Sequence, residues 1–214
     1  LREIGQNGGK LVSQVGAMAS RAAPAGTLGA TPVADRVVAS AVRPSIAPFN
    51  TTVQNTAPNS DLSADPDLRI GSFDGQTVSR GFLTWDLRQL RGQKIAKATL
   101  RMYAEWAPTC QPQTWQVWSS GPIRASTRWP SQPAGQQLWA STNATLGHGT
   151  GCAPGWINVD LTELVRNWLS RDALTGTIMV RAADEYSPSG WKRFSSSEGL
   201  KPPALGVTLD PTTP

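Results

Sequence analysis

The sequence is poor in the side chains from which most catalytic and metal sites are built. Its 214 residues include one histidine and two cysteines, which is too few for a tetrahedral zinc site. The histidine, His148, lies in a glycine-rich stretch and no GxSxG motif is present, so a nucleophilic triad is not expected. Asp184 and Glu185 are adjacent just before a turn, so their carboxylates diverge rather than form a glycosidase pair. We therefore expect that the protein is not an enzyme.

Charge and long apolar runs are also scarce. Charged residues make up 16% of the chain, and the formal net charge is +5. Residues 1–50 hold five of the 20 basic and two of the 15 acidic residues, which leaves only +2 on residues 51–214. No stretch approaches the about 20 apolar residues of a membrane helix. We expect neither a nucleic-acid partner nor a membrane span.

The two cysteines, Cys110 and Cys152, do not form a CxxC motif. A single disulfide that closes a long loop is the most economical interpretation, and two buried thiols are the alternative. A disulfide predicts an oxidising compartment, so the protein is expected to be secreted, extracellular or at the cell surface.

Turn-forming residues and tryptophan are abundant. The chain has 20 glycines and 17 prolines, a balance that favours a β-rich fold with many loops. Nine tryptophans stand against two tyrosines and four phenylalanines. Because tryptophan is bulky, rigid and amphipathic, this excess indicates either a tryptophan-filled core or a stacking surface.

The pattern divides the chain into three parts. Residues 1–50 are rich in Ala, Gly and Pro without a sustained period, which is typical of an irregular arm or linker that packs on its own domain or on a partner chain. Residues 51–210 show many short alternating segments, and residues 211–214 form a tail. The segments predict strands or a strand-plus-helix at 68–72, 80–87, 97–106, 113–120, 155–169, 176–182, 191–197 and 204–209. Residues 121–151 are expected to form a long loop, and the strands at 176–182 and 191–197 are expected to pair.

Together these segments predict an all-β fold, a jelly-roll-like β-sandwich with one short helix. The helix follows Asp160 and places Leu161, Leu164, Val165 and Trp168 on one apolar stripe.

Seven segments in linear order resemble a known family. They are LRIG, GFLTWDLRQLRGQKIAKATLRMY, TRWPSQP, WINVDLTELVRNWL, GTIMVRAADE, WKRFSSSE and PPALGVTL. The order resembles the DNRLRE-type domain of secreted bacterial proteins, in particular an actinobacterial branch, over residues 51–210. The hexapeptide that names this family is absent, and DLRIG stands in its neighbourhood.

The resemblance implies a carbohydrate-binding-module-like β-sandwich. Such a domain would be a non-catalytic extracellular module of a larger secreted protein that binds polysaccharide or cell wall. The alternative is a structural or assembly domain that docks to other domains or chains, as in YD-repeat (RHS-like) surface or toxin proteins, and has no glycan ligand. No ligand motif of the family transfers residue by residue.

Sugar binding requires flat aromatic faces with polar side chains beside them. Trp85 and Trp115 alternate with core aliphatic residues and are excluded. In the strand 191–197, alternation with a buried Phe194 sends Trp191 and Arg193 outward. The pairing expected above brings Arg181 near them, although an ion-pair lattice is the alternative interpretation. The candidate ligand-binding residues are Trp191, Arg193, Arg181, Trp118 and Trp139.

One acidic cluster offers a candidate metal site. Asp61, Asp65 and Asp67 lie within seven residues, and their oxygen atoms suit structural calcium. The spacing differs from that of an EF-hand, and turn formation is the alternative role. No other cofactor is expected.

Overall fold

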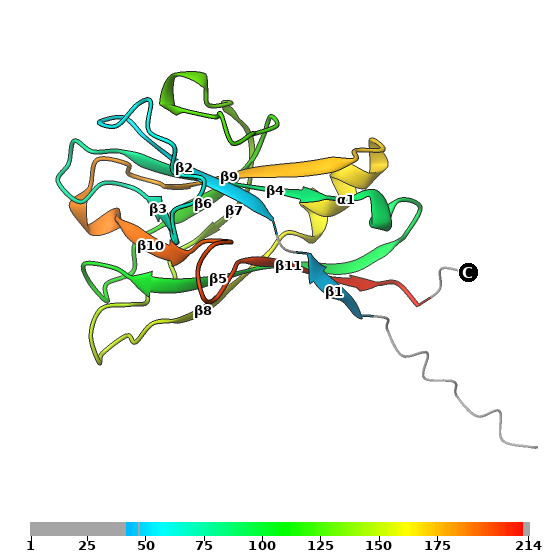
Figure 1. Cartoon of the computed structure of the whole chain (residues 1–214). Coiled ribbons are helices and arrows are strands. Elements are labelled where there is room, and N and C mark those ends of the chain that lie inside the picture. Colours follow the sequence, from blue (N-terminus) through cyan, green and yellow to red (C-terminus); the bar gives the residue numbers. More distant parts are fainter. Residues whose placement is uncertain (1–41, 47, 212–214) are drawn as a thin grey trace, which may run out of the picture. The chain divides into compact units, whose positions relative to one another are not determined.

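The computed structural model describes residues 42–46 and 48–211, which form a sandwich of two antiparallel β-sheets (Figure 1). The six-stranded sheet consists, in spatial order, of β1 (Val42–Ile46), β11 (Ala204–Leu209), β5 (Ile95–Trp106), β10 (Lys192–Ser195) and β3 (Asp67–Ile70), with β8 (Gly155–Asp160) on the other side of β5. The five-stranded sheet has the order β2 (Phe49–Gln54), β4 (Ser79–Asp86), β9 (Thr175–Ala182), β6 (Trp115–Ser120) and β7 (Gly135–Thr142). The described helices are α1 (Thr162–Ser170) and the 3-10 helices η1 (Arg88–Leu90), η2 (Trp129–Ser131) and η3 (Pro188–Gly190). The predicted all-β sandwich with one short helix is confirmed.

The sandwich begins earlier in the chain than the sequence predicted. β1 pairs with β11, with Val42 opposite Thr208, and β2 pairs with β4. Both strands start within residues 1–50, which were assigned to an arm. The composition indicated an arm instead of a strand because β1 contains Pro44. A proline is tolerated there, since β1 lies at the edge of the sheet. Residues 1–41 of the predicted arm and 212–214 of the tail lie outside the described residues.

Two further expectations are wrong. The predicted loop 121–151 contains β7, whose residues are half-buried or exposed on both faces and so show no hydrophobic alternation. The strand at 176–182, β9, does not pair with β10. It lies between β4 and β6 in one sheet, and β10 lies in the other, because residues 183–191 cross between the layers instead of forming a hairpin.

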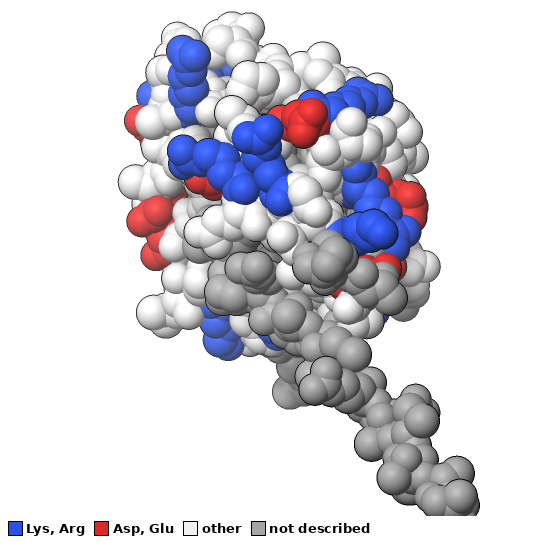
Figure 2. Space-filling model, turned by 90° about the vertical axis from the view of Figure 1, so that its right-hand side faces the viewer, with Lys and Arg blue, Asp and Glu red and all other residues white. Residues whose placement is uncertain are grey.

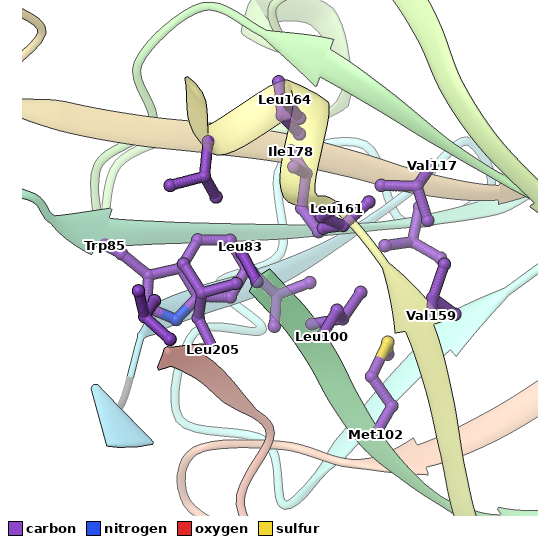
Figure 3. Packing of buried hydrophobic residues seen from close by; sticks show 14 of the residues in the cluster. Leu83, Trp85, Leu100, Met102, Val117, Val159, Leu161, Leu164, Ile178 and Leu205 are labelled. Carbon is purple, nitrogen blue, oxygen red and sulfur yellow. The ribbon is translucent and has the colours of Figure 1, made fainter. Parts of the chain in front are cut away.

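The main core fills the space between the sheets. Side chains from both sheets meet there, together with Leu161 and Leu164 from the start of α1 (Figure 3). Trp168 of α1 also packs into this core, against Gly176 of β9, where a Cβ atom would lie 2.4 Å from the indole ring. The predicted apolar stripe of the helix therefore closes one end of the sandwich.

β10 is shorter than the predicted strand 191–197, and its residues 192–194 alternate as predicted, whereas Ser195, expected outward, is buried. Phe194 and Lys192 point inward, and Arg193 points outward. Lys192 is only 1% exposed, and its Nζ donates a hydrogen bond to Thr145 Oγ1 at 2.9 Å. Burial lowers the pKa of Lys192 to about 8, because a charged ammonium is poorly solvated in the interior.

The predicted disulfide is present. Cys110 and Cys152 are bonded, with 5.7 Å between their Cα atoms. Cys110 follows β5 and Cys152 precedes β8, and these two strands pair with each other. The bond therefore holds together the two ends of an excursion through β6 and β7.

The outer face of the five-stranded sheet carries a second, smaller hydrophobic cluster. Phe82 of β4 and Met179 of β9 are opposite each other in register and point away from the main core. Ile123 and Trp129 of the segment 121–134 pack over them. We call this outer surface the covered face.

Candidate functional site

The outer face of the six-stranded sheet is more exposed than the covered face, although the segment 196–201 folds over Ser195 at one end of it. Along β8, the outward residues Trp156, Asn158 and Asp160 are all exposed. Large aromatic side chains also remain accessible on this side, with Trp106 at 36%, Trp156 at 40% and Phe73 at 58% exposure. We call this surface the open face.

A register shift places one of these tryptophans on the open face. Between β10 and β5, Arg193 lies opposite Trp106 whereas Phe194 lies opposite Ala104. Two steps on β5 thus match one step on β10, which is a β-bulge. Strict alternation would send Trp106 inward with Ala104, but the bulge places it beside the outward Arg193.

Trp106, Trp191 and Phe73 form a contiguous set that we call the bare aromatic group. The rings of Trp106 and Trp191 are edge to face, with centroids 5.0 Å apart and an interplanar angle of 69°. Phe73 also contacts Trp191, with ring centroids 6.1 Å apart and an interplanar angle of 77°. Among the described residues, no Lys or Arg side chain is recorded over these three rings.

A second aromatic pair on the open face has its rings occupied. Tyr103 of β5 and Trp156 of β8 are cross-strand neighbours with centroids 5.3 Å apart. Lys201 Nζ lies 3.7 Å from the centre of Tyr103, and the Arg101 guanidinium lies 4.7 Å from that of Trp156. These cation–π contacts cover part of each ring, so this capped pair offers less stacking surface than the bare aromatic group.

Charged side chains lie next to the bare aromatic group. Arg193, opposite Trp106, is 3.4 Å from a carboxylate oxygen of Asp67. Asp67 also hydrogen-bonds to the carboxyl group of Glu105. Burial, followed by this hydrogen bond and repulsion from Asp67, raises the pKa of Glu105. The oxygen atoms of this pair can accept hydrogen bonds from hydroxyl groups.

Exposed aromatic rings beside hydrogen-bonding charged groups are suited to binding sugars. A comparison with protein-family models matches residues 43–208 to carbohydrate-binding module family 96. The chain belongs to this family. No curated protein matches the sequence. The expected carbohydrate-binding-module-like domain is therefore confirmed, and the narrower DNRLRE-type and actinobacterial assignment stays a prediction.

The module's disulfide and its family fit an extracellular protein. Within the described part of the chain, no helix is long and apolar enough to cross a membrane.

The structure divides the sequence-predicted ligand-binding residues among three places. Trp191 and Arg193 lie on the open face as predicted. Arg181 lies on the outer side of the other sheet, because β9 does not pair with β10. There its guanidinium is 4.8 Å from the ring centre of Trp118 and 3.6 Å from Glu185, so Arg181 makes a cation–π contact and an ion pair on that sheet.

Trp139 lies in the third place. It was expected in a loop but belongs to β7, at the edge of the five-stranded sheet, where it packs partly against the main core.

The three aspartates of the candidate calcium site face arginines. Asp61 is 3.0 Å from Arg128, Asp65 is 2.7 Å from Arg69, and Asp67 contacts Arg193 as described. In the described ranges, no group of three or more His, Cys, Asp or Glu side chains could hold a metal ion. The geometry does not bring these carboxylates together as one ligand set.

Sequence reasoning missed four aromatic residues of the open face. Trp156 had a usable signal, since it alternates with Asn158 and Asp160 opposite the buried Ile157 and Val159. Trp106 had none, because the bulge that turns it outward depends on its pairing with β10. The remaining missed residues are Phe73 and Tyr103.

Proposed function

We propose that this module binds polysaccharide on the open face, with sugar rings stacked on Trp106 and Trp191. The observation that carries the proposal is the bare aromatic group. Trp106 is exposed and Trp191 is half-buried, and without a covering cation their rings are available to the apolar faces of sugars. Packing alone does not explain why two tryptophans in edge-to-face contact lie on this solvent-facing surface.

The neighbouring polar groups supply hydrogen bonds to sugar hydroxyls. Arg193 donates, and the oxygen atoms of Asp67 and Glu105 accept. Because the open face is a surface rather than a deep cleft, it suits an internal stretch of a polymer. By binding without hydrolysis, the module would tether a larger secreted protein to cell wall or extracellular matrix.

The test is affinity electrophoresis of the protein against a panel of neutral and acidic polysaccharides, for example xylan, β-glucan, mannan and alginate. We expect retardation in at least one gel, and Trp106→Ala and Trp191→Ala should each weaken the affinity about tenfold. Trp118→Ala is the matched control on the covered face and should retain the wild-type affinity. Circular dichroism confirms that each variant is folded.

Two results would overturn the proposal. One is the absence of retardation by every polysaccharide at millimolar sugar concentration, which would favour the structural or assembly role. The other is retardation that survives in both tryptophan variants, which would place the binding site elsewhere on the module.

A further inference from the structure

A hollow of about 500 Å³ lies away from the bare aromatic group, between the edge strand β7 and the first turn of α1. Its volume falls within the range of small-molecule sites, about 300–1,000 Å³. Its lining includes Lys97, Trp139, Asp160, Thr162, Glu163 and Arg166. The lining combines one large aromatic ring with several polar side chains.

A bulge in β7 brings Trp139 to this hollow. Leu138 pairs with Trp118 and Ala140 pairs with Val117, so Trp139 is the extra residue between two consecutive pairs. Bulges change the direction of a side chain at a sheet edge. The ring of Trp139 therefore lies along the hollow instead of following the alternation of the strand.

The indole N–H of Trp139 is buried and has no hydrogen-bond partner in the described structure. Both tryptophans of the adjacent strand do have partners: Trp115 Nε1 donates to Ala144 O at 3.1 Å, and Trp118 Nε1 to Gln116 Oε1 at 3.0 Å. Trp85 also lacks one, but it is enclosed in the main core. A buried donor without a partner is costly, but this N–H is also out of reach of a ligand in the hollow, so Trp139 offers the hollow its ring.

The polar groups around the hollow are held in fixed positions. Asp160 accepts hydrogen bonds from the N–H and hydroxyl of Thr162, which lower the pKa of its carboxyl group and keep it ionised. The Arg166 guanidinium donates to the carbonyls of Ile95 and Ala96. A prearranged set of groups loses little entropy when a ligand binds.

The charges around the hollow balance. Lys97 and Arg166 stand against Asp160 and Glu163, and Arg166 is already paired with Glu163 at 2.7 Å. The Thr162 N–H at the start of α1 is taken by Asp160, so it does not offer an anion site. Figure 2 views the side on which α1 lies in Figure 1, and it shows basic residues interspersed with acidic ones. A neutral ligand matches this environment better than an anion.

We propose that this hollow is a second carbohydrate site, which takes a single neutral hexose unit such as the end of a glycan chain. The apolar face of the hexose packs on the indole of Trp139. Its hydroxyls accept a hydrogen bond from Lys97 and donate to the carboxylate of Asp160. Lys97 is available because no ion pair with it is recorded among the described residues. The site does not require that the open face binds polysaccharide.

The experiment is a titration of the protein with D-glucose, D-mannose and D-galactose, followed by NMR of the tryptophan indole N–H signals. Sodium D-glucuronate is the anionic comparison. We expect at least one neutral hexose to shift the Trp139 signal at millimolar to tens of millimolar concentration, and glucuronate to bind more weakly. Trp139→Leu keeps an apolar side chain but lacks the aromatic ring, and it should weaken the affinity about fivefold. Lys97→Ala should have a similar effect and tests the site without altering core packing.

The variant Trp106→Ala/Trp191→Ala separates this site from the open face and should bind the hexose as the wild type does. A hexose response that disappears in this double variant would overturn the second site, as would the absence of any shift at Trp139 with all three hexoses. Preferential binding of glucuronate would contradict the neutral ligand class. Loss of polysaccharide retardation with an intact Trp139 response would instead refute the proposed function alone.

Discussion

The two outer faces of the sandwich are made of similar side chains and are used differently. Both carry tryptophans beside arginines. On the covered face, Arg181 lies over Trp118 and Arg80 lies 5.0 Å from the ring centre of Trp129, and the segment 121–134 packs across the sheet. On the open face, Trp106 and Trp191 contact each other, with Trp106 exposed and Trp191 half-buried.

The difference shows that residue type does not identify a binding surface. A Trp–Arg pair is a structural element where a loop buries its apolar side, and a candidate ligand contact where nothing does. The covering segment is therefore as decisive for the function of the module as the aromatic residues themselves.

The largest expected effect is the loss of stability when the hydrophobic cluster of the covered face is truncated. Phe82 is 0% exposed under the covering segment, so Phe82→Ala should lower the free energy of unfolding by about 3–5 kcal/mol. Phe73→Ala, its counterpart on the open face, should cost less than about 1 kcal/mol. Urea denaturation measures both. Equal costs would show that the two faces do not differ in burial.

The second prediction tests the register of β10 that turns Arg193 outward. Because burial lowers the pKa of Lys192 to about 8 from 10.5, the unfolded chain binds more protons than the folded one between these pH values. Stability should therefore rise with pH across this window. Lys192→Met should be more stable than wild type at pH 7, by on the order of 3 kcal/mol, with the advantage shrinking from pH 8 to 10.5.

Denaturation of both proteins at several pH values measures this difference. If β10 were shifted by one residue, Lys192 would face solvent and its replacement would leave the pH dependence unchanged.

A matched pair of arginine substitutions compares the two faces by their effect on polysaccharide affinity. Arg193→Ala on the open face should weaken polysaccharide affinity about fivefold, because it removes a charged hydrogen-bond donor. Arg181→Ala should leave the affinity unchanged and reduce stability by about 1 kcal/mol, since it removes a cation–π contact. Affinity electrophoresis and thermal denaturation provide the two measurements. A larger binding loss for Arg181→Ala would move the site to the other sheet.

The smallest effect is expected within the open face itself. Arg101→Ala/Lys201→Ala removes the cations that cover Trp156 and Tyr103, and the affinity should stay within about threefold of wild type if the bare aromatic group carries the binding. A loss of tenfold or more would show that the capped pair belongs to the polysaccharide site.

Much of the sandwich could be predicted from the sequence because burial on one face leaves a period of two. The alternation of Leu83 and Trp85, and that of Lys192 to Phe194, gave both the strands and their inward faces. What local patterns do not contain is the partner of each strand. The expected pairing of β9 with β10 was wrong for this reason, and with it the placement of Arg181 beside Trp191.

The candidate site was predictable only in part for the same reason. Trp191 and Arg193 follow from alternation within one strand. Trp106 and Trp139 each depend on a bulge, and a bulge is a property of two paired strands. Trp139 was selected from the sequence as a loop residue, and its place in β7 beside a polar hollow required the paired structure.

The disulfide also has a mechanical consequence. Cys110 and Cys152 are 42 residues apart in sequence, and β6, the covering segment and β7 all lie between them. When the two ends of the domain are pulled apart, tension passes through the sulfur atoms and bypasses this excursion. The oxidised domain would withhold roughly 140 Å of contour length that the reduced one releases. A module that tethers under shear would thus be protected from complete extension on the side of the covered face.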